Sequence, residues 1–404
     1  MFTRVSYKLL FNSAFFICVI SIILQIIPVR AHEEDGNIGA ETHSHSIYSE
    51  KSNRILSEID KAMKNHLFHG CSNCSCYHSV ISEDLKPFKN GVTKELIDEA
   101  NSKGTRYVIT DGNLYREKPC LFPARCQGVE HFLLQLVAEL PDSEFIVNTR
   151  DWPQSAVYQH TRPLPIFSFS KTGDFYDIMY PAWGFWEGGP AIKLFPRGLG
   201  RWDLMRKSLK AAANKTPWEK KSSTAFFRGS RTSGERDEIV LLSREAPQLV
   251  DAAYTKNQAW KSEADTLGRP PAEEVSLEDH CKYKYLFNFR GVAASFRFKH
   301  LFLCNSLVFH VGEEWLEFFY SNLKPWVHYI PVKKDANRKE IADLLLFFKE
   351  HDSLAREIAE RGKSFIDKHL RLKDVKCYWR KLLQDYSSLL KFKPQLKSDM
   401  MKLS

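Results

Sequence analysis

The sequence predicts an α/β fold made of two consecutive halves. Segments with a helical period alternate with short apolar strands, which is typical of parallel sheets covered by helices. A stretch rich in proline and glycine, residues 180–200, interrupts this alternation, which starts again at Arg201. The length of the chain also indicates two domains, because the roughly 370 residues that follow a leader exceed what one hydrophobic core usually supports. Residues 52–205 and 206–365 are therefore the two predicted domains.

The first half is predicted from apolar spacing and turn residues. Thr93 is a suitable N-cap, Asp111-Gly112 suits a hairpin turn, and Pro141 stops an amphipathic helix. In chain order, we expect helices over 52–69 and 93–102, strands over 107–110 and 113–115, a helix over 128–140, and strands over 144–149 and 166–170.

The second half repeats the helix and strand rhythm. In chain order, we expect a helix over 202–213, a strand over 223–228, a helix over 237–245, a strand over 284–287, a helix over 293–303, strands over 306–310 and 329–332, and helices within 339–363. Residues 366–395 hold a long final helix, over about 366–390, which is expected to fold back on the first half. Residues 396–404 are left as a tail.

The N-terminus predicts entry into the secretory pathway. Basic residues, a long apolar run and small residues follow one another over residues 1–31, the order of a cleaved signal peptide. An uncleaved anchor is the alternative, since about 20 apolar residues can span a bilayer. Residues 32–51 are polar and lack periodicity, which indicates a disordered spacer.

Cysteine usage agrees with export. Of nine cysteines, Cys18 lies in the leader, which leaves an even set in the mature chain. An even set at uneven spacing indicates disulfides, although spacing alone does not assign the pairs. Zinc is the alternative for the first three, Cys71, Cys74 and Cys76, but no matching second pair follows. Asn73 and Asn214 open N-glycosylation tripeptides.

Charge excludes one class of partner. The formal net charge is +9, three of these charges belong to the leader, and the remaining excess is spread along the chain. Lysine and arginine never form a long basic arm, which disfavours nucleic-acid binding. Beyond the leader, no apolar run is long enough to cross a membrane.

Asp151 is the first candidate for chemistry. It directly follows a buried strand, at the carboxyl end where α/β sheets bind ligands. A carboxylate there is able to accept the proton of an attacking hydroxyl. The alternative is a structural aspartate that caps a turn.

Two basic segments follow predicted strands in the second half. Residues 228–236 and 290–297 combine arginines, small residues and hydroxyls at expected helix starts, which suits phosphate oxygens. Ordinary polar turns and close helix packing are the alternatives. Aromatic residues are also dense over 176–202, in a loop that suits either recognition or packing between domains.

Several longer strings are distinctive enough to be compared with a known family. They are Asn-Cys-Ser-Cys-Tyr-His (73–78), Phe-Pro-Ala-Arg-Cys (122–126), Phe-Ser-Phe-Ser-Lys-Thr (167–172), Asp-Ile-Met-Tyr-Pro-Ala-Trp (177–183), Phe-Arg-Gly-Ser-Arg-Thr-Ser (227–233), Tyr-Thr-Lys-Asn-Gln-Ala-Trp-Lys-Ser (254–262) and His-Cys-Lys-Tyr-Lys-Tyr-Leu-Phe-Asn-Phe-Arg-Gly-Val-Ala-Ala-Ser-Phe-Arg (280–297). These strings closely resemble the Rumi-like protein O-glucosyltransferases, and the likeness covers residues 52–390, nearly the whole mature chain.

This resemblance implies a GT-B glycosyltransferase, in which two Rossmann-like domains face a cleft. Such enzymes transfer glucose from UDP-glucose to the serine of Cys-x-Ser-x-Pro/Ala-Cys in folded EGF-like repeats, notably those of Notch. They invert the anomeric centre and use no metal, so we expect no cofactor, and we expect a monomer.

The resemblance also implies residue roles. Asp151 matches the catalytic base. The UDP-glucose site is matched by Ser230, Arg236, Val292, Ala293, Ala294, Ser295, Phe296 and Arg297. The acceptor-contacting segments are matched by Leu121, Phe122, Pro123, Ala124 and Arg125, and by Pro190, Ala191, Ile192, Lys193, Leu194, Phe195 and Pro196. The implied bridges are Cys71–Cys76, Cys74–Cys377, Cys120–Cys126 and Cys281–Cys304.

Two alternatives stay open beside this assignment. The same site would also suit UDP-xylose, because a pocket discriminates weakly on one small group. A non-catalytic chaperone or lectin for EGF-like repeats is the other. The expected location is the lumen of the endoplasmic reticulum, but the final residues, Met401 to Ser404, are not a KDEL-like retrieval signal, so secretion is the alternative address.

Overall fold

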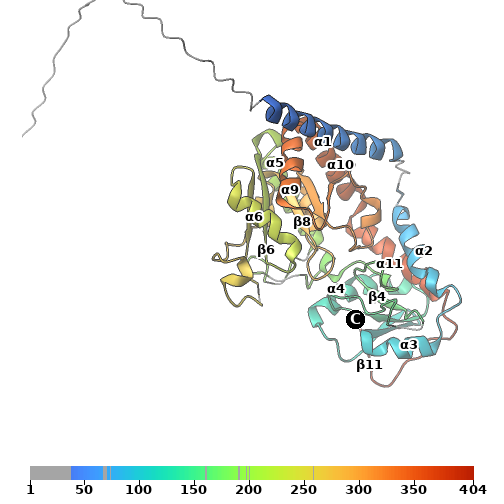
Figure 1. Ribbon diagram of the computed structural model, residues 1–404. Coiled ribbons are helices and arrows are strands. Elements are labelled where there is room, and N and C mark those ends of the chain that lie inside the picture. Colours follow the sequence, from blue (N-terminus) through green and yellow to red (C-terminus); the bar gives the residue numbers. More distant parts are fainter. Residues whose placement is uncertain are drawn as a thin grey trace, which may run out of the picture. The chain divides into compact units, whose positions relative to one another are not determined.

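Residues 52–404 contain two α/β lobes, each built on its own sheet (Figure 1). The predicted leader, residues 1–31, and Asn73 lie outside the residues that the structure describes. The computed structural model describes residues 38–66, 71–72, 74–159, 162–189, 192–196, 198–199, 201–257 and 259–404.

The first lobe has a mixed sheet with the strand order β11-β2-β1-β3-β4-β5. Its strands are β1 (Thr105–Thr110), β2 (Asn113–Glu117), β3 (Ser143–Val147), β4 (Ile166–Ser168), β5 (Ile178–Met179) and β11 (Met400–Lys402). The predicted hairpin is confirmed, because Thr110 pairs with Asn113 and the turn residues Asp111 and Gly112 have φ of 50° and 69°. That tight turn makes β2 antiparallel to β1, so the expectation of a parallel sheet is correct here only for β3, β4 and β5.

The second lobe has the predicted parallel sheet, with the order β10-β9-β8-β6-β7. Its strands are β6 (Ser222–Gly229), β7 (Val250–Tyr254), β8 (Tyr283–Phe289), β9 (Leu307–Val311) and β10 (Ile330–Val332). The chain runs outward from β6 to β7 on one side, then from β8 to β10 on the other. The order therefore reverses between β6 and β8, and ligands of open α/β sheets bind at such a point.

Helices cover these sheets. The first lobe carries α2 (His78–Leu85), α3 (Lys94–Ala100) and α4 (Pro123–Leu134). The second carries α5 (Trp202–Lys215), α6 (Asp237–Glu245), α7 (Leu277–His280), α8 (Phe298–Leu303), α9 (Arg338–Glu350) and α10 (Asp352–His369). The predicted domain boundary at residues 205 and 206 falls inside α5, which packs against α7 and α8.

The disordered spacer expected over residues 32–51 is wrong for its described part. Helix α1 (Ile38–Asn65) already includes residues 38–51, ahead of the helix predicted from residue 52. Once a helix has nucleated, each further residue adds a hydrogen bond, so a polar segment without proline extends it. Within residues 52–65, Ile59 is 5% exposed and belongs to the core of the second lobe.

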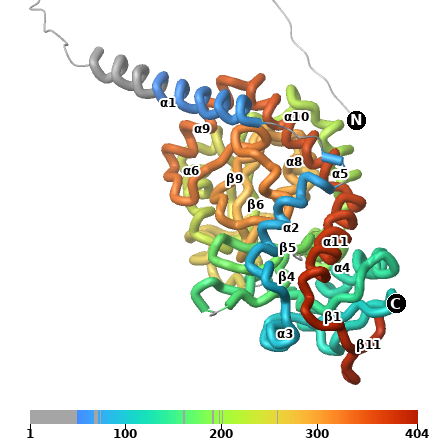
Figure 2. Tube along the Cα trace, turned by 90° about the vertical axis from the view of Figure 1, so that its right-hand side faces the viewer, coloured from blue at the N-terminus to red at the C-terminus, as the bar shows by residue number. Residues whose placement is uncertain are grey.

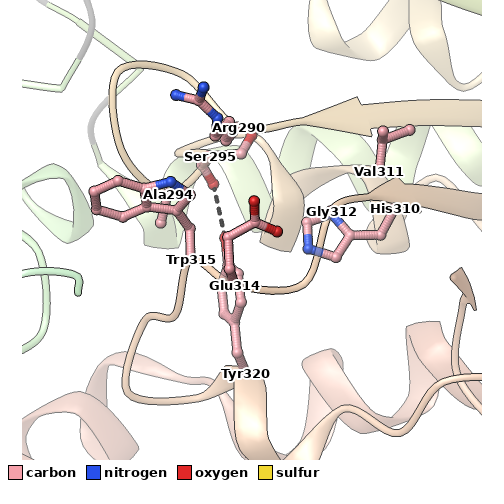
Figure 3. A pocket seen from close by; sticks show the side chains of 9 residues that line it. All are labelled: Arg290, Ala294, Ser295, His310, Val311, Gly312, Glu314, Trp315 and Tyr320. Carbon is pink, nitrogen blue, oxygen red and sulfur yellow. Dashed lines mark hydrogen bonds between the residues drawn. The ribbon is translucent and has the colours of Figure 1, made fainter. Parts of the chain in front are cut away.

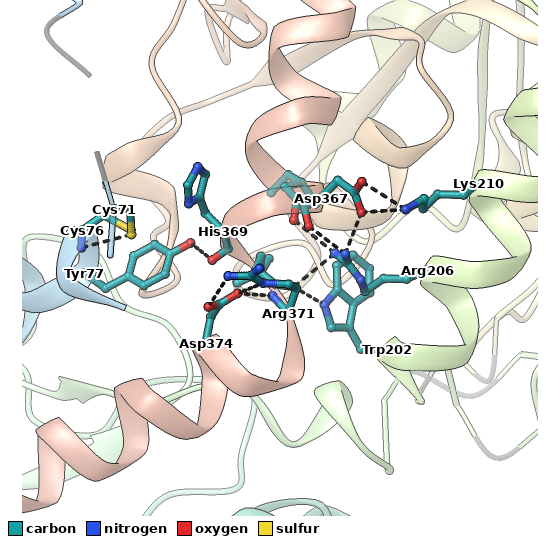
Figure 4. A network of polar contacts seen from close by, with 12 residues as sticks. Cys71, Cys76, Tyr77, Trp202, Arg206, Lys210, Asp367, His369, Arg371 and Asp374 are labelled. Carbon is teal, nitrogen blue, oxygen red and sulfur yellow. Dashed lines mark hydrogen bonds and ion pairs between the residues drawn. A yellow bond between two sulfur atoms is a disulfide. The ribbon is translucent and has the colours of Figure 1, made fainter. Parts of the chain in front are cut away.

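The long final helix is interrupted between α10 and α11 (Leu372–Ser387). Figure 4 shows the reason, since side chains of α5 donate hydrogen bonds to backbone carbonyls at the end of α10. Trp202 Nε1 donates to the Leu370 carbonyl at 2.6 Å, and Arg206 donates to the Ile366 carbonyl at 3.1 Å. Asp374 then accepts from the backbone of Arg371 at 2.7 Å, which starts a new helix.

The fold-back of the C-terminal helix is confirmed. In Figure 2, α11 runs beside α2 in the first lobe, and the two helices contact each other. Tyr386 donates to the Glu144 carbonyl of β3 at 3.2 Å, and Tyr378 to the Met179 carbonyl of β5 at 3.0 Å. The predicted tail also contributes structure, because β11 pairs antiparallel with β2.

Candidate functional site

Asp151 lies in a turn that buried polar groups hold after β3. Asn148 is fully buried and donates from Nδ2 to the Trp152 carbonyl at 2.8 Å and to Ser168 Oγ at 2.9 Å. Ser168 donates in turn to Asp177, whose carboxylate also accepts the Gln154 and Ser155 amides. These buried hydrogen bonds fix the turn, while the Asp151 side chain stays 42% exposed.

Arg125, at the start of α4, is the ion-pair partner of Asp151. Its Nη1 lies 3.0 Å from Asp151 Oδ1 and donates to the Thr149 carbonyl at 2.7 Å. Helix α4 begins at Pro123, earlier than the expected residue 128, because proline suits the first helical position. Arg125 therefore points from the predicted acceptor segment toward the predicted base.

Two arginines, the buried Arg236 and the partly buried Arg297, meet at the carboxyl ends of β6 and β8. Arg236 donates to the carbonyls of Ser230 and Arg290, and Arg297 donates to the carbonyl of Arg228. Both guanidinium groups lie beside the Phe227 ring, 5.6 and 5.3 Å from its centroid. Gly229 leaves room for them, since a Cβ there would lie 3.0 Å from Arg297 Nη2 and 3.4 Å from Arg236 Nη1.

This pair concentrates positive charge. Burial lowers the pKa of Arg297 to about 10, and burial together with Arg297 lowers that of Arg236 to about 9, so both remain cationic at neutral pH. Neither forms an ion pair with another residue in the part of the chain that the structure describes. Two neighbouring cations, one buried and one partly buried, at the switch point between β6 and β8 suit an anion such as a diphosphate.

Residues 290–297 form a turn, whereas a helix was expected from residue 293 onward. Helix α8 begins only at Phe298, because the polar groups of this segment are engaged elsewhere. Ser295 donates from Oγ to Asn288 Oδ1 at 2.7 Å, and the Gly291 amide donates to the Ala293 carbonyl at 2.8 Å. Ala293, Ala294 and Ser295 are buried, whereas Val292 is half-exposed.

A narrow pocket opens between the ends of β8 and β9 (Figure 3). Two predicted donor-site residues, Ala294 and Ser295, line it, together with Arg290, His310 and Trp315. His310 lies 2.9 Å from Asn288 Nδ2 through Nδ1, and burial lowers its pKa to about 4, so it is neutral. The other predicted donor-site residues do not line this pocket.

Aromatic rings join the two candidate centres across the lobes. Phe296 of the second lobe lies 5.0 Å from Phe169 and 5.7 Å from Trp183 of the first, between ring centroids. Gly184 permits this approach, because a Cβ there would lie 2.9 Å from the Phe296 ring. Trp183 also stacks with Arg125 at 4.6 Å, so a continuous packed path runs from Asp151 to the residue before Arg297.

A second contact lies next to Asp151. The rings of Trp152 and Trp315 are 4.9 Å apart, and Lys171 and Leu316 pair through their backbones. Trp315 also lines the pocket. Sequence analysis placed Trp183 only within the aromatic stretch 176–202 and missed Trp152, His310 and Trp315 as site residues, because their positions depend on lobe packing rather than on a local motif.

The predicted acceptor segments differ in how far the structure describes them. Leu121 and Phe122 are exposed beside Arg125, whose guanidinium lies 4.4 Å from the Phe122 ring centroid. Residues 192–196 form a turn in which Ile192 and Phe195 pair through their backbones, with Leu194 45% exposed. Pro190 and Ala191 lie outside the described residues.

The four implied disulfides are present, and they resolve the zinc alternative for Cys71, Cys74 and Cys76. The structure joins Cys71–Cys76, Cys74–Cys377, Cys120–Cys126 and Cys281–Cys304. Asn214 is exposed near the end of α5, so its glycosylation stays a prediction. None of the described helices is long and apolar enough to cross a membrane.

Comparison with known proteins finds relatives that cover most of this chain. The "O-glucosyltransferase rumi homolog" of Aedes aegypti is 60% identical over 346 residues, which cover 86% of each chain. "Protein O-glucosyltransferase 1" of Homo sapiens is 58% identical, over 84% of this chain and 86% of that protein. "O-glucosyltransferase rumi" of Drosophila melanogaster is 54% identical, over 93% of this chain and 94% of that protein. Residues 70–404 match glycosyl transferase family 90, and the chain therefore belongs to that family.

Proposed function

We propose that this chain transfers glucose from UDP-glucose to the serine of Cys-x-Ser-x-Pro/Ala-Cys in folded EGF-like repeats, such as those of Notch-type receptors. The names of its relatives support a protein O-glucosyltransferase. One structural observation carries the proposal. An exposed carboxylate on the first lobe, Asp151, connects through Arg125, Trp183 and Phe296 to the arginine pair of the second lobe.

The proposed reaction is a single displacement with inversion. The serine Oγ attacks the anomeric carbon and its proton passes to Asp151, while the bond between that carbon and the UDP oxygen breaks. UDP leaves with the bonding electron pair. Arg236 and Arg297 stabilise the charge that develops on the diphosphate, as fixed cations in a dry site do effectively. Because these cations neutralise the leaving group, the proposal requires no divalent metal.

Transfer to a folded acceptor tests the function. Purified protein is incubated with UDP-glucose and a disulfide-bonded EGF-like repeat that carries the consensus, and the product is examined by mass spectrometry. We expect one hexose on the consensus serine, and none on a repeat with alanine there or on a reduced repeat. Absence of transfer to the intact repeat would refute the proposal, and competition with UDP-xylose decides the donor.

Substitution of the proposed base separates chemistry from binding. Asp151→Asn keeps the shape of the side chain but cannot accept a proton, so UDP-glucose should bind with unchanged affinity while transfer is lost. Asp174→Asn is the matched control, because Asp174 is an exposed aspartate of the same lobe whose carboxylate accepts a hydrogen bond from Thr172 Oγ1 at 3.2 Å. Normal glucosylation by Asp151→Asn would exclude Asp151 as the base.

We propose the lumen of the endoplasmic reticulum as the place of action. The predicted leader and the four disulfides support it, because such bridges persist in oxidising compartments. Fractionation of tagged protein tests this location. Accumulation in the medium, with none in the endoplasmic reticulum, would contradict it.

A further inference from the structure

We propose that Arg125 is a positioning residue for Asp151, which holds one carboxylate oxygen so that the other faces the hydroxyl to be deprotonated. This inference rests on the proposed function of Asp151 as the base. It gives Arg125 a task other than the acceptor contact that the resemblance implies for residues 121–125.

The contacts of the guanidinium group indicate this task. One nitrogen, Nη1, serves both Asp151 Oδ1 at 3.0 Å and the Thr149 carbonyl at 2.7 Å. It thereby ties the carboxylate to the backbone of its own turn. Asp151 Oδ2 makes no hydrogen bond to any residue that the structure describes and is left for a proton.

Arg125 is itself held by two aromatic rings. Its guanidinium lies 4.4 Å from the Phe122 ring centroid and 4.6 Å from that of Trp183, and cations stack favourably on such rings. The arginine side chain is 22% exposed and the aspartate side chain 42% exposed. The cation is therefore more enclosed than the carboxylate, which suits a support better than a contact that reaches into solvent.

The backbone under Arg125 is also fixed. The Cys120–Cys126 disulfide closes the turn that leads into α4, and Pro123 occupies its first position. On the other side, Gly188 has φ of +73°, and a Cβ there would lie 2.8 Å from the carbonyl of Ala124. Residue 188 must therefore be glycine for the aromatic loop to press against the Arg125 backbone.

A fixed base matters because catalysis depends on the orientation of the reacting groups. A misplacement of about 1 Å can reduce a rate roughly 100-fold. Asp151 lies at the exposed end of a turn, where an unpaired side chain would sample several rotamers. The rigid cation restricts it to one, and the same Trp183 ring that supports Arg125 contacts Phe296 beside the donor site.

The test compares Arg125→Gln and Arg125→Lys with Arg150→Gln. Arg150 is the matched control, since it neighbours Asp151 in sequence but its guanidinium donates to the Lys103 carbonyl at 2.8 Å instead of to Asp151. For Arg125→Gln we expect kcat for glucosyl transfer to fall between 10- and 100-fold, with the KM for UDP-glucose unchanged. UDP-glucose hydrolysis without acceptor should fall by a similar factor, because water also needs the base. Arg125→Lys should recover part of the loss, and Arg150→Gln should match the wild type.

Two results would overturn the inference. If Arg125→Gln raises only the KM for the EGF-like repeat and leaves hydrolysis unchanged, Arg125 is an acceptor contact. If a crystal structure of the variant shows Asp151 in its original orientation, Arg125 does not position it, whatever the substrate is. The proposed function fails separately, when the wild-type protein itself transfers no glucose. Melting temperatures of all variants identify any that do not fold.

Discussion

Removal of the Cys74–Cys377 bridge should cost more stability than removal of any other disulfide. The bridge joins residues 303 positions apart and ties α11 to the start of the first lobe. A cross-link restricts the unfolded chain more when it closes a longer loop. The loop-entropy relation gives about 5.7 kcal/mol for this separation, as an upper bound.

The other bridges provide an internal scale. The same relation gives about 3.4 kcal/mol for Cys281–Cys304, with a separation of 23, and about 2 kcal/mol for Cys71–Cys76, with a separation of 5. Cys281 and Cys304 are the better control, because both are fully buried, as Cys74 is, and their replacement leaves a comparable cavity.

The assay uses paired Cys→Ala variants, so that no free thiol remains. Denaturant unfolding followed by tryptophan fluorescence gives the free energy of unfolding of each. Hydrogen exchange then reports on residues 372–387, whose protection should fall only in the Cys74→Ala/Cys377→Ala variant, since α11 keeps its buried tyrosines but loses its covalent tie. The reasoning is refuted if this variant loses no more free energy of unfolding than Cys281→Ala/Cys304→Ala.

Three further predictions follow from single contacts. Gly229→Ala should raise the Kd for UDP, measured by calorimetry, because the new Cβ would lie 3.0 Å from Arg297 Nη2 and displace it; an unchanged Kd would place the diphosphate elsewhere. The free energy of unfolding should fall as pH falls from 6.5 toward 4, because burial lowers the pKa of His280 and His310 to about 4 whereas the unfolded imidazoles bind protons near pH 6.5. The unfolded state binds more protons between pH 6.5 and 4, so the contribution of the neutral histidines to the free energy of unfolding is complete above pH 6.5 and is lost below it. The loss reaches up to about 3 kcal/mol per histidine. His310→Asn should flatten the pH profile of the free energy of unfolding measured with denaturant. Trp202→Phe should destabilise the protein by about 1 kcal/mol through loss of the bond to Leu370, and an equal melting temperature would contradict that role.

Local sequence was sufficient where one segment carries the whole signal. Residues 237–245 were predicted as a helix with the observed bounds of α6, and Asp111-Gly112 located the hairpin, because both depend on neighbours within a few positions. It was insufficient for β5, β7 and β11, which were not predicted. These strands exist because a partner strand offers hydrogen bonds, as β2 does for residues 400–402.

Errors in helix limits have the same origin. Helix α8 begins later than predicted, at Phe298, because Ser295 forms a hydrogen bond with Asn288 of β8. The final helix is interrupted because Trp202 and Arg206 donate hydrogen bonds to carbonyls at the end of α10. Asn288, Trp202 and Arg206 all lie on other elements of the fold. No apolar period within the segment itself contains that information.

By itself the sequence determined the two-lobed α/β class, the disulfide-bonded character, Asp151 and the arginine segments as candidates, and the family resemblance. Each of these depends on local pattern, cysteine count or matched strings. Tertiary structure alone decided which candidates meet. It paired Arg125 with Asp151, brought Arg236 to Arg297, and linked the two centres through Trp183 and Phe296. The physical reason is that ion pairs and ring contacts act over a few ångströms in space, between residues that are tens to more than a hundred positions apart in the chain.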